Sequence, residues 1–139
     1  MHIAIAKMWI YQQVTADPVI TAYVPPDRIT DDVTQATAYP ILQYTSVDPV
    51  PISRGIGGAI LGADGLYLVK LILASKSNTP ALPAYNQIKA RLHNGFGQTS
   101  QGIVLSSQLE QEINYGELVS GVQYRHLGAI FRIYTQEMQ

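Results

Sequence analysis

The sequence has no cysteine, a single tryptophan and two phenylalanines, and only 14% of its residues are charged. Without cysteine, disulfide bonds, thiolate metal ligands and cysteine nucleophiles are all excluded. No apolar run approaches the roughly 18 residues that a membrane-spanning helix requires, so we expect no association with a membrane. Residues 1–13 also lack the basic region and the small-residue cleavage site of a signal peptide, which predicts a soluble intracellular chain.

An excess of positive charge is missing as well. The formal net charge is -1, whereas proteins that grip a phosphate backbone carry a basic stripe or a high isoelectric point. We therefore expect no sequence-specific binding of nucleic acid. Hydrophobic residues make up 47% of the 139 residues, which is typical of one globular domain spanning residues 1–139. The low charge suggests that partners cover part of its surface.

Three segments have the spacing and the end signals of helices. Residues 3–15 place apolar side chains at helical spacing. Asp17-Pro18 supplies an N-cap and a first-turn proline for a short second helix, which must end at residues 24–26 because two prolines stand there. Thr79-Pro80 opens a third helix in the same way, and Asn94-Gly95 ends it.

Four segments have the composition of strands: 40–48, 65–75, 102–113 and 121–134, with residues 114–117 as the turn between the last two. The order of helices and strands predicts an α+β fold, an antiparallel sheet of about four strands with helices packed on one face. The alternation of apolar and polar residues along these strands predicts the core of the sheet. It comprises Tyr67, Val69, Leu71, Leu73, Ile103, Leu105, Leu109, Phe131 and Ile133.

Residues 49–64 contain two prolines and four glycines and are too broken for regular structure, so we expect an irregular loop or a ragged hairpin. The stretch RGIGG at 54–58 superficially resembles a phosphate-binding loop. No Gly-Lys-Ser/Thr follows it, and no strand-turn-helix unit frames it. A flexible loop is the favoured interpretation, because glycine clusters mostly mark chain mobility.

The final strand changes phase partway along its length. Val122 and Tyr124 occupy even positions, whereas the apolar residues from Leu127 to Ile133 occupy odd ones. Because each face of a strand takes one parity, an extra residue at Arg125-His126 is indicated. This pair is either a catalytic device or a β-bulge, and we favour the bulge because no partners for proton transfer are evident.

Other candidate chemistry is sparse. Glu110 and Glu112 are predicted to share the outward face of one strand, about 6–7 Å apart. Two carboxylates at that distance can act as acid and base only in a cleft that raises one pKa, and the alternative is a solvated strand face. The three histidines show no metal-binding spacing. We therefore assign no catalytic, cofactor-binding or metal-binding residues, expect no cofactor, and expect that the protein is not an enzyme.

The order and spacing of these pieces resemble the tail-completion, or tail-terminator, family of tailed bacteriophages. The resemblance spans nearly the whole chain, and the recurrent features are a strand that opens with Tyr39-Pro40-Ile41 and a final strand that brings Tyr124 and His126 before Phe131-Arg132. The pieces in order are YQQVTADPVITAYVPPDRI, YPILQYTSV, LYLVKLILASKS, QIKARLHN, LEQEINYGE and YRHLGAIFRIY. The segment at 49–64 is longer and richer in glycine than the family pattern.

The resemblance implies a structural virion protein of the tail or neck, assembled in the host cytoplasm. Its members form a hexameric ring that caps the tail tube, ends tube polymerisation and offers a surface to the head connector. The implied partners are thus further copies of the chain, the tube protein and a connector or neck protein. The implied interface residues are Arg54, Ile56, Gly57 and Gly58 in the 49–64 loop, and Arg125 and His126 at a bend that helps to close the ring.

Two alternatives remain open at this stage. One is a neck or stopper component of the head-tail connector, which gene position would distinguish from a terminator. The other is a small enzyme or ligand-binding domain that uses the Glu110 and Glu112 face, which a deep pocket with a desolvated carboxylate would favour.

Overall fold

The computed structural model describes residues 2–31, 38–47, 52–54 and 60–137. The helices are α1 (His2–Thr15), α2 (Pro18–Tyr23) and α3 (Leu82–Leu92), with 3-10 turns at Pro26–Arg28 and Thr79–Ala81. The strands are β1 (Ile29–Thr30), β2 (Ile41–Ser46), β3 (Ile52–Arg54), β4 (Ile60–Leu73), β5 (Gly97–Gln98), β6 (Gly102–Val119) and β7 (Val122–Glu137). In the described part of the chain, no helix is long and apolar enough to cross a membrane.

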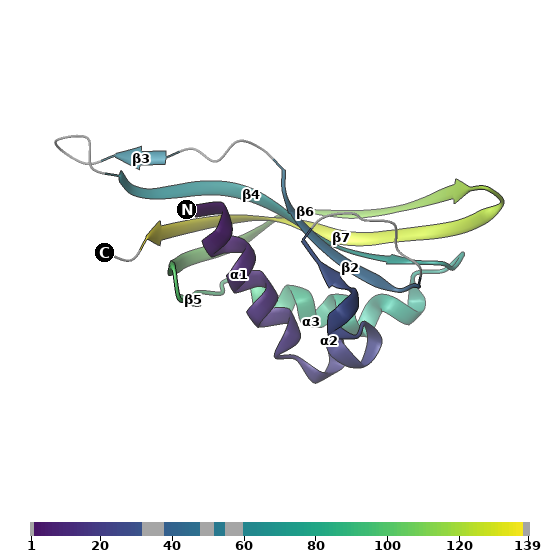
Figure 1. Ribbon diagram of the computed structural model, residues 1–139. Helices are drawn as coiled ribbons and strands as arrows, with labels where there is room; N and C mark the ends of the chain where they lie inside the picture. The colour runs from purple at the N-terminus through teal and green to yellow at the C-terminus, as the bar shows by residue number, and fades with distance from the viewer. Residues whose placement is uncertain (1, 32–37, 48–51, 55–59, 138–139) are drawn as a thin grey trace.

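The described strands form one seven-stranded sheet in the order β1-β2-β4-β7-β6-β5, with β3 paired to β4. Only β1 and β2 run parallel, and the other neighbours are antiparallel. The helices lie together on one face of this curled sheet (Figure 1). The α+β class and the one-sided helix layer are therefore confirmed. The expected number of about four strands was too low, because β1, β3 and β5 have only two or three residues each and leave little pattern in the sequence.

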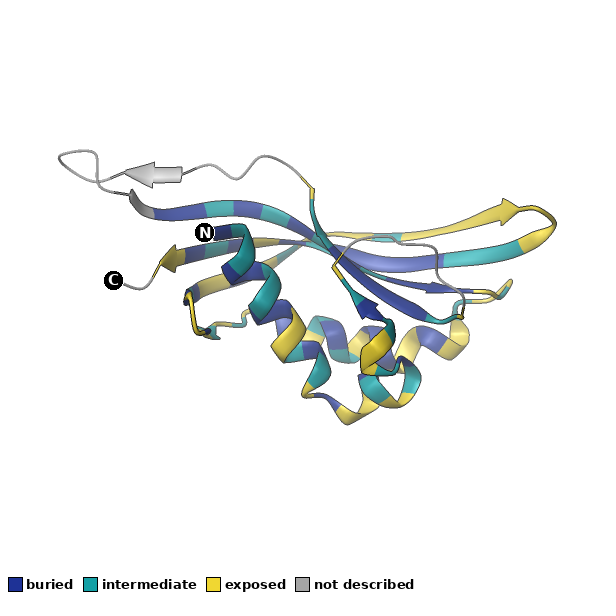
Figure 2. Ribbon diagram, viewed as in Figure 1, coloured by how far each residue is buried: buried dark blue, intermediate teal, exposed yellow. Residues whose placement is uncertain are grey.

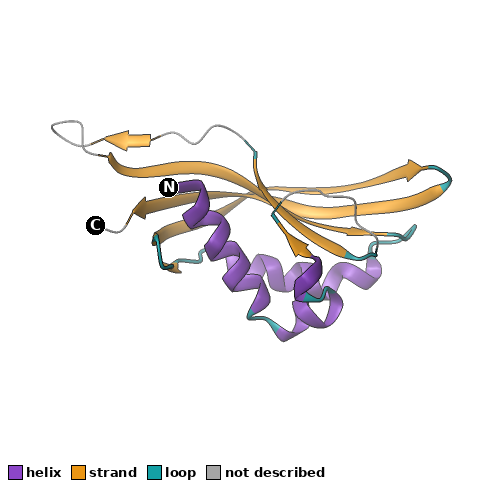
Figure 3. Cartoon of the chain, in the orientation of Figure 1, coloured by secondary structure: helices purple, strands orange, loops and turns teal. Residues whose placement is uncertain are grey.

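The three helices form where the sequence predicts them (Figure 3). Asp17 caps α2, since its Oδ1 accepts the N–H of Val19 at 2.9 Å and that of Ile20 at 3.4 Å. At α3 the expected cap is wrong. Thr79 begins a 3-10 turn, and α3 starts three residues later without a side-chain cap.

The core lies between the helices and the sheet. Six of the nine predicted core residues are buried there: Tyr67, Val69, Leu71, Leu73, Phe131 and Ile133. Leu109 is partly buried against this cluster, whereas Ile103 is intermediate and Leu105 is 46% exposed. All of the errors therefore fall on β6.

Two irregularities in β6 explain the errors. Its register against β7 shifts between Val104 and Ser106 and again between Leu109 and Gln111. Each extra residue moves the following side chains to the opposite face, because side chains alternate along a strand. Val104 and Ser107 consequently lie in the interior, where the alternation predicted Leu105 instead.

The predicted bulge at Arg125-His126 is wrong. Both residues pair in unbroken register with β4 on one side and with β6 on the other. The apparent change of phase has a different cause. Val122 and Tyr124 lie beyond the end of β4, where no helix covers either face, so their parity carries no information about the core.

The segment at 49–64 is a ragged hairpin in its described residues. Arg54 ends β3, which pairs with the start of β4 through a register irregularity. Ile56, Gly57 and Gly58 lie outside the described residues, so the loop that they were predicted to form stays a prediction.

The predicted turn at 114–117 is also wrong. β6 continues to Val119, and the hairpin turns at Ser120 and Gly121, whose φ angles are +50° and +81°. Two consecutive positive φ angles define the two-residue turn that matches the twist of a hairpin. The long strands that result run well past the helices, and their far end is exposed on both faces (Figure 2).

Candidate assembly surface

A two-stranded arm projects from one end of the sheet. β4 ends at Leu73, opposite Arg125 of β7, and Arg125 in turn pairs with Gly116 of β6. We call residues 116–125 the arm: beyond the base pair of Gly116 and Arg125, β6 and β7 pair only with each other among the described strands. Isolated two-stranded ribbons are marginally stable in water, so an arm of this kind needs support at its base.

Part of that support comes from His126, on the face of the sheet opposite the helices. Its Nε2 donates to Oε1 of Glu117 at 3.0 Å, and its ring stacks on Tyr115 with centroids 4.4 Å apart and planes 7° apart. The side chain is 6% exposed, and its Nδ1 has no hydrogen-bond partner among the described residues. His126 thus ties the arm to the body from a buried position.

Further contacts brace the same region. The ring of Tyr39 lies 5.0 Å from that of Tyr124, which joins the segment before β2 to the arm. Lys70 of β4 donates to the hydroxyl of Tyr115 at 3.3 Å. Across the hairpin, Arg125 Nη2 donates to Asn114 Oδ1 at 2.7 Å. These contacts hold the arm in one orientation rather than leaving it to swing.

The electrostatic state of His126 follows from its position. Burial lowers the pKa of His126 below its ordinary value, although the hydrogen bond to Glu117 acts in the opposite direction. The imidazole is therefore neutral near pH 7. In this neutral form it donates one hydrogen bond to the carboxylate of Glu117, and this bond braces the arm.

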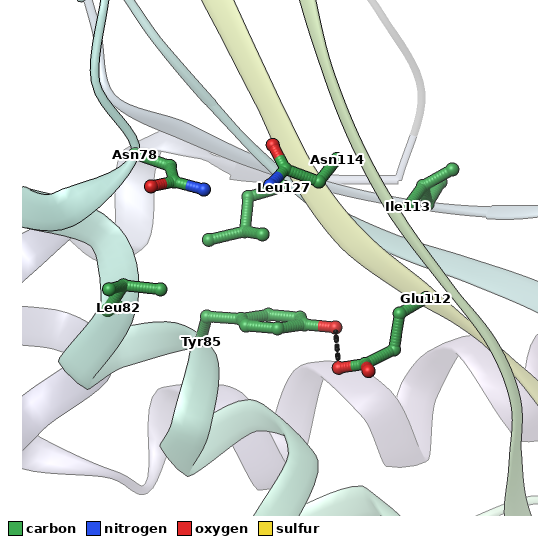
Figure 4. A pocket seen from close by; sticks show the side chains of 7 residues that line it. All are labelled: Asn78, Leu82, Tyr85, Glu112, Ile113, Asn114 and Leu127. Carbon is green, nitrogen blue, oxygen red and sulfur yellow. Dashed lines mark hydrogen bonds between the residues drawn. The ribbon is translucent and has the colours of Figure 1, made fainter.

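A pocket of about 250 Å³ lies on the other face of the arm's base, between α3 and β6 (Figure 4). Its wall combines apolar side chains with two amides and a carboxylate, and the lining residues are Asn78, Leu82, Tyr85, Glu112, Ile113, Asn114 and Leu127. Tyr85 donates to Glu112 Oε1 at 2.6 Å, and Lys89 donates to the same oxygen at 2.8 Å. The polar wall of the pocket is thus fixed by α3.

The pocket does not hold a reactive carboxylate. Hydrogen bonds from Lys89 and Tyr85 lower the pKa of Glu112, and burial raises the pKa of Tyr85. Glu110 points to the opposite face, where it pairs with Arg132, because it is the extra residue of the second irregularity of β6, between Leu109 and Gln111. The expectation that the two glutamates share one face is therefore wrong. Their carboxylates do not have the geometry of an acid-base pair.

The outer edge of β6 is open along the arm and its base. β5 covers β6 only at Ile103 and Val104, and the loop after α3 bonds to it at Ser107 and Leu109. No described strand pairs with this edge from Gln111 to Val119. Such an edge exposes backbone donors and acceptors that another strand can use.

The tip of the arm is apolar. Leu118 is 69% exposed, and Val119 and Val122 beside the turn are exposed as well. Isolated exposed apolar residues are common on protein surfaces. Val119 and Val122 pair across the hairpin and share one face, whereas Leu118 projects from the other. Both faces of the tip are thus apolar, which makes the tip a candidate contact surface.

The predicted interface residues are thus partly brought together. Arg125 and His126 lie at the arm, whereas Arg54 lies in β3, in the hairpin at the opposite end of β4 (Figure 1). The sequence pattern does not predict the exposed tip, because it predicts the turn at residues 114–117 instead. Ser120-Gly121, a dipeptide typical of turns, is the signal that would have located it. No three His, Asp or Glu side chains among the described residues are placed to hold a metal ion.

Comparison with known proteins adds one finding. No protein-family model matches the chain, and neither does any curated protein. Among solved structures, a chain from the virion of a native gene transfer agent (GTA) particle is similar, with a TM-score of 0.74 and 19% sequence identity. The alignment covers 96% of this chain and 96% of that chain, so the two share one fold from end to end.

Proposed function

We propose that the protein is a structural component of a phage-like virion, a ring subunit that caps the tail tube, ends its polymerisation and offers a surface to the head connector. The observation that carries this proposal is the full-length likeness to a chain of a virion particle. The resemblance of the sequence to the tail-terminator family, which rests on the order and spacing of its segments, supports the same role.

The layout of the subunit suits a ring. A cyclic ring needs a head-to-tail contact between two different patches on one subunit. The arm supplies one patch. At the other end of β6, about 50 Å away by strand rise, Phe96 is 74% exposed in the turn before β5. We place the arm of one subunit against this end of the next, where β3 with Arg54 also lies.

Within this contact the predicted residues take different roles. Arg125 is part of the arm's surface, whereas His126 is buried and acts by holding the arm in place. Capping then requires no chemistry, because a ring that occupies the growing end of a tube leaves no site for the next subunit. The effect is stoichiometric in rings and tube ends.

The proposal is tested by adding the purified protein to polymerising tube subunits and measuring tube lengths by electron microscopy. We expect lengths to fall as the ratio of protein to tube subunits rises, with no effect of chelators or nucleotides. Phe96→Ser should weaken ring formation and capping together. Val19→Ser, which changes an exposed valine on α2 and leaves both ends of β6 intact, serves as the matched control. Tubes of unchanged length with bound wild-type rings would overturn the capping role.

A neck or stopper ring is the second candidate, because it would use the same head-to-tail contact. It differs in its partner. A stopper binds connector rings and leaves tube length unchanged, so the same mixtures analysed with connector in place of tube subunits distinguish the two.

A further inference from the structure

The open edge of β6 carries two charged side chains, Glu112 and Glu117, but lacks the other usual protection of an edge strand. Natural edges are blunted by lysine, proline or bulges, or are very short. The sequence from Gly102 to Gln139 contains no lysine and no proline. Both register irregularities of β6 precede Gln111, so the edge from Gln111 to Val119 is regular over nine residues. An edge of this length and regularity is a template for another strand.

The side chains beside this edge fit a particular neighbour. Beyond Gln111 the register is unbroken, so Glu112, Asn114, Gly116 and Leu118 share one face of β6. That face is the one with the pocket, since Glu112 and Asn114 line it. Leu118, the most exposed of the large apolar residues at the tip, therefore points to the same side of the sheet as the pocket. Along β6 it is four residues from Asn114 and six from Glu112 in the pocket wall.

We propose that two copies of the chain pair through this edge, antiparallel and about a two-fold axis near Tyr115, so that Leu118 of each copy enters the pocket of the other. With Tyr115 opposite itself, Leu118 lies opposite Glu112 of the second copy. Directly paired residues of antiparallel strands project from the same face, so each Leu118 side chain lies beside the partner's pocket.

A second copy fits better than an unrelated strand because the surface is self-complementary. A two-fold contact needs a projection and its matching hollow on the same patch, and β6 carries both. In this register Glu112 faces Leu118, and Glu117 faces Ile113. No two carboxylates stand opposite each other, so pairing brings no like charges together.

The pair and the ring exclude each other if the arm also forms the ring contact proposed above. The two-fold pair would then be the form of the free protein, and a ring would assemble only where a tube end displaces one arm from the other. This consequence rests on the proposed function, whereas the pairing itself does not.

The absence of cysteine permits a direct test in the full chain. Leu118→Cys and Glu112→Cys are purified separately, mixed, and oxidised mildly. Across the proposed pair these positions are directly opposite, at the Cα separation of about 5 Å that a disulfide accepts. Each variant alone places its two cysteines about 20 Å apart, because identical positions are offset by six residues. We expect disulfide-linked dimer in the mixture at about tenfold or more over either variant alone.

Equal yields in the mixture and in the separate variants, or no linked product, would overturn the pairing. A second measurement avoids dependence on cysteine. We expect Leu118→Asp to raise the dimer dissociation constant, measured by analytical ultracentrifugation, by about tenfold or more, whereas the control Leu105→Asp leaves it unchanged. A wild-type protein that stays monomeric at concentrations where linked dimer should form also overturns it. Tube capping enters neither measurement, so failure of the capping proposal is seen separately.

Discussion

The body of the protein and its arm are held by different forces. Helices α1 to α3 cover one face of the sheet, and between them lie fully buried side chains such as Trp9 and Phe131. In the arm, by contrast, Gly116 to Val122 are all exposed, and a few polar and aromatic contacts at the base fix its direction. Burial of apolar area therefore sets the stability of the fold, whereas side-chain contacts set the position of the contact surface.

This separation has a functional consequence. A surface that stabilises its own subunit cannot also be free for a partner. Because the arm contributes little to the core, its edge and its tip are free to contact other chains without loss of subunit stability. The comparison predicts that changes in the body alter unfolding, whereas changes in the arm alter assembly.

The largest effect is expected in the body. Phe131 is fully buried and pairs with Tyr67 across β4 and with Leu109 across β6. Phe131→Ala leaves a cavity in the core and should lower the free energy of unfolding by about 3–5 kcal/mol. Urea unfolding followed by circular dichroism measures this loss.

The matched change in the arm is Val122→Ala. Val122 is exposed beside the hairpin turn, so we expect a change within about 0.5 kcal/mol. Similar losses for Phe131→Ala and Val122→Ala would show that arm and body are not separate in stability, which breaks the comparison.

The sequence predicts the body better than the arm for the same reason. The sequence shows helical spacing or strand alternation of apolar residues where one face of an element must be buried, as along β4 from Tyr67 to Leu73. At the far end of the arm both faces are exposed, so the alternation of apolar and polar residues there does not predict which side chains are buried. The false bulge at Arg125-His126 and the false turn at 114–117 both arose there. The two irregularities of β6 escaped notice because each depends on pairing with β7, which a single strand does not record.

The candidate site was predicted only in outline. The sequence singled out Arg125 and His126, and both lie at the arm. Nothing in local sequence indicates that His126 reaches Glu117 or that Glu112 meets Tyr85, because these pairs are nine and 27 residues apart and form only when the strands align. Such contacts can be predicted only when the register of the paired strands is known, and that register is known only from the folded structure.

An intermediate effect is expected where the helices are joined by a buried charge. Arg91 of α3 donates to Asp17 Oδ2 at 2.8 Å, and Asp17 is 4% exposed. Asp17→Asn preserves a capping residue for α2 but loses the ionic hydrogen bond, so we expect a loss of about 1.5–3 kcal/mol in unfolding free energy. Denaturant unfolding at pH 7 measures it.

The same contact predicts a pH dependence. Burial acts to raise the pKa of Asp17, but hydrogen bonds from Arg91, Val19 and Ile20 outweigh it and lower the pKa below its ordinary value. The contribution of Asp17 is then complete above the unfolded value of about 3.9 and is lost as the pH falls through the folded value. Between about pH 5 and pH 3, wild type should therefore lose more stability than Asp17→Asn. Parallel curves for the two proteins would contradict this account.

A local effect at the base of the arm sharpens the comparison, because it is confined to the arm. His126→Phe keeps a ring that can stack on Tyr115 but removes the hydrogen bond to Glu117. We expect a local loss of about 1 kcal/mol, seen as roughly fivefold faster hydrogen exchange in the arm and little change in the body from Leu127 to Ile133.

The lowered pKa of His126 adds a second signature. Its bracing is complete above the ordinary histidine value of about 6.5 and is lost as the pH falls toward the folded value, since the buried ring must then take up a proton. Arm exchange, corrected for the intrinsic effect of pH, should therefore rise on acidification in the wild type and stay level in His126→Phe. If the variant keeps the pH dependence, or if the body loosens as much as the arm, His126 is not the residue that holds the arm in place.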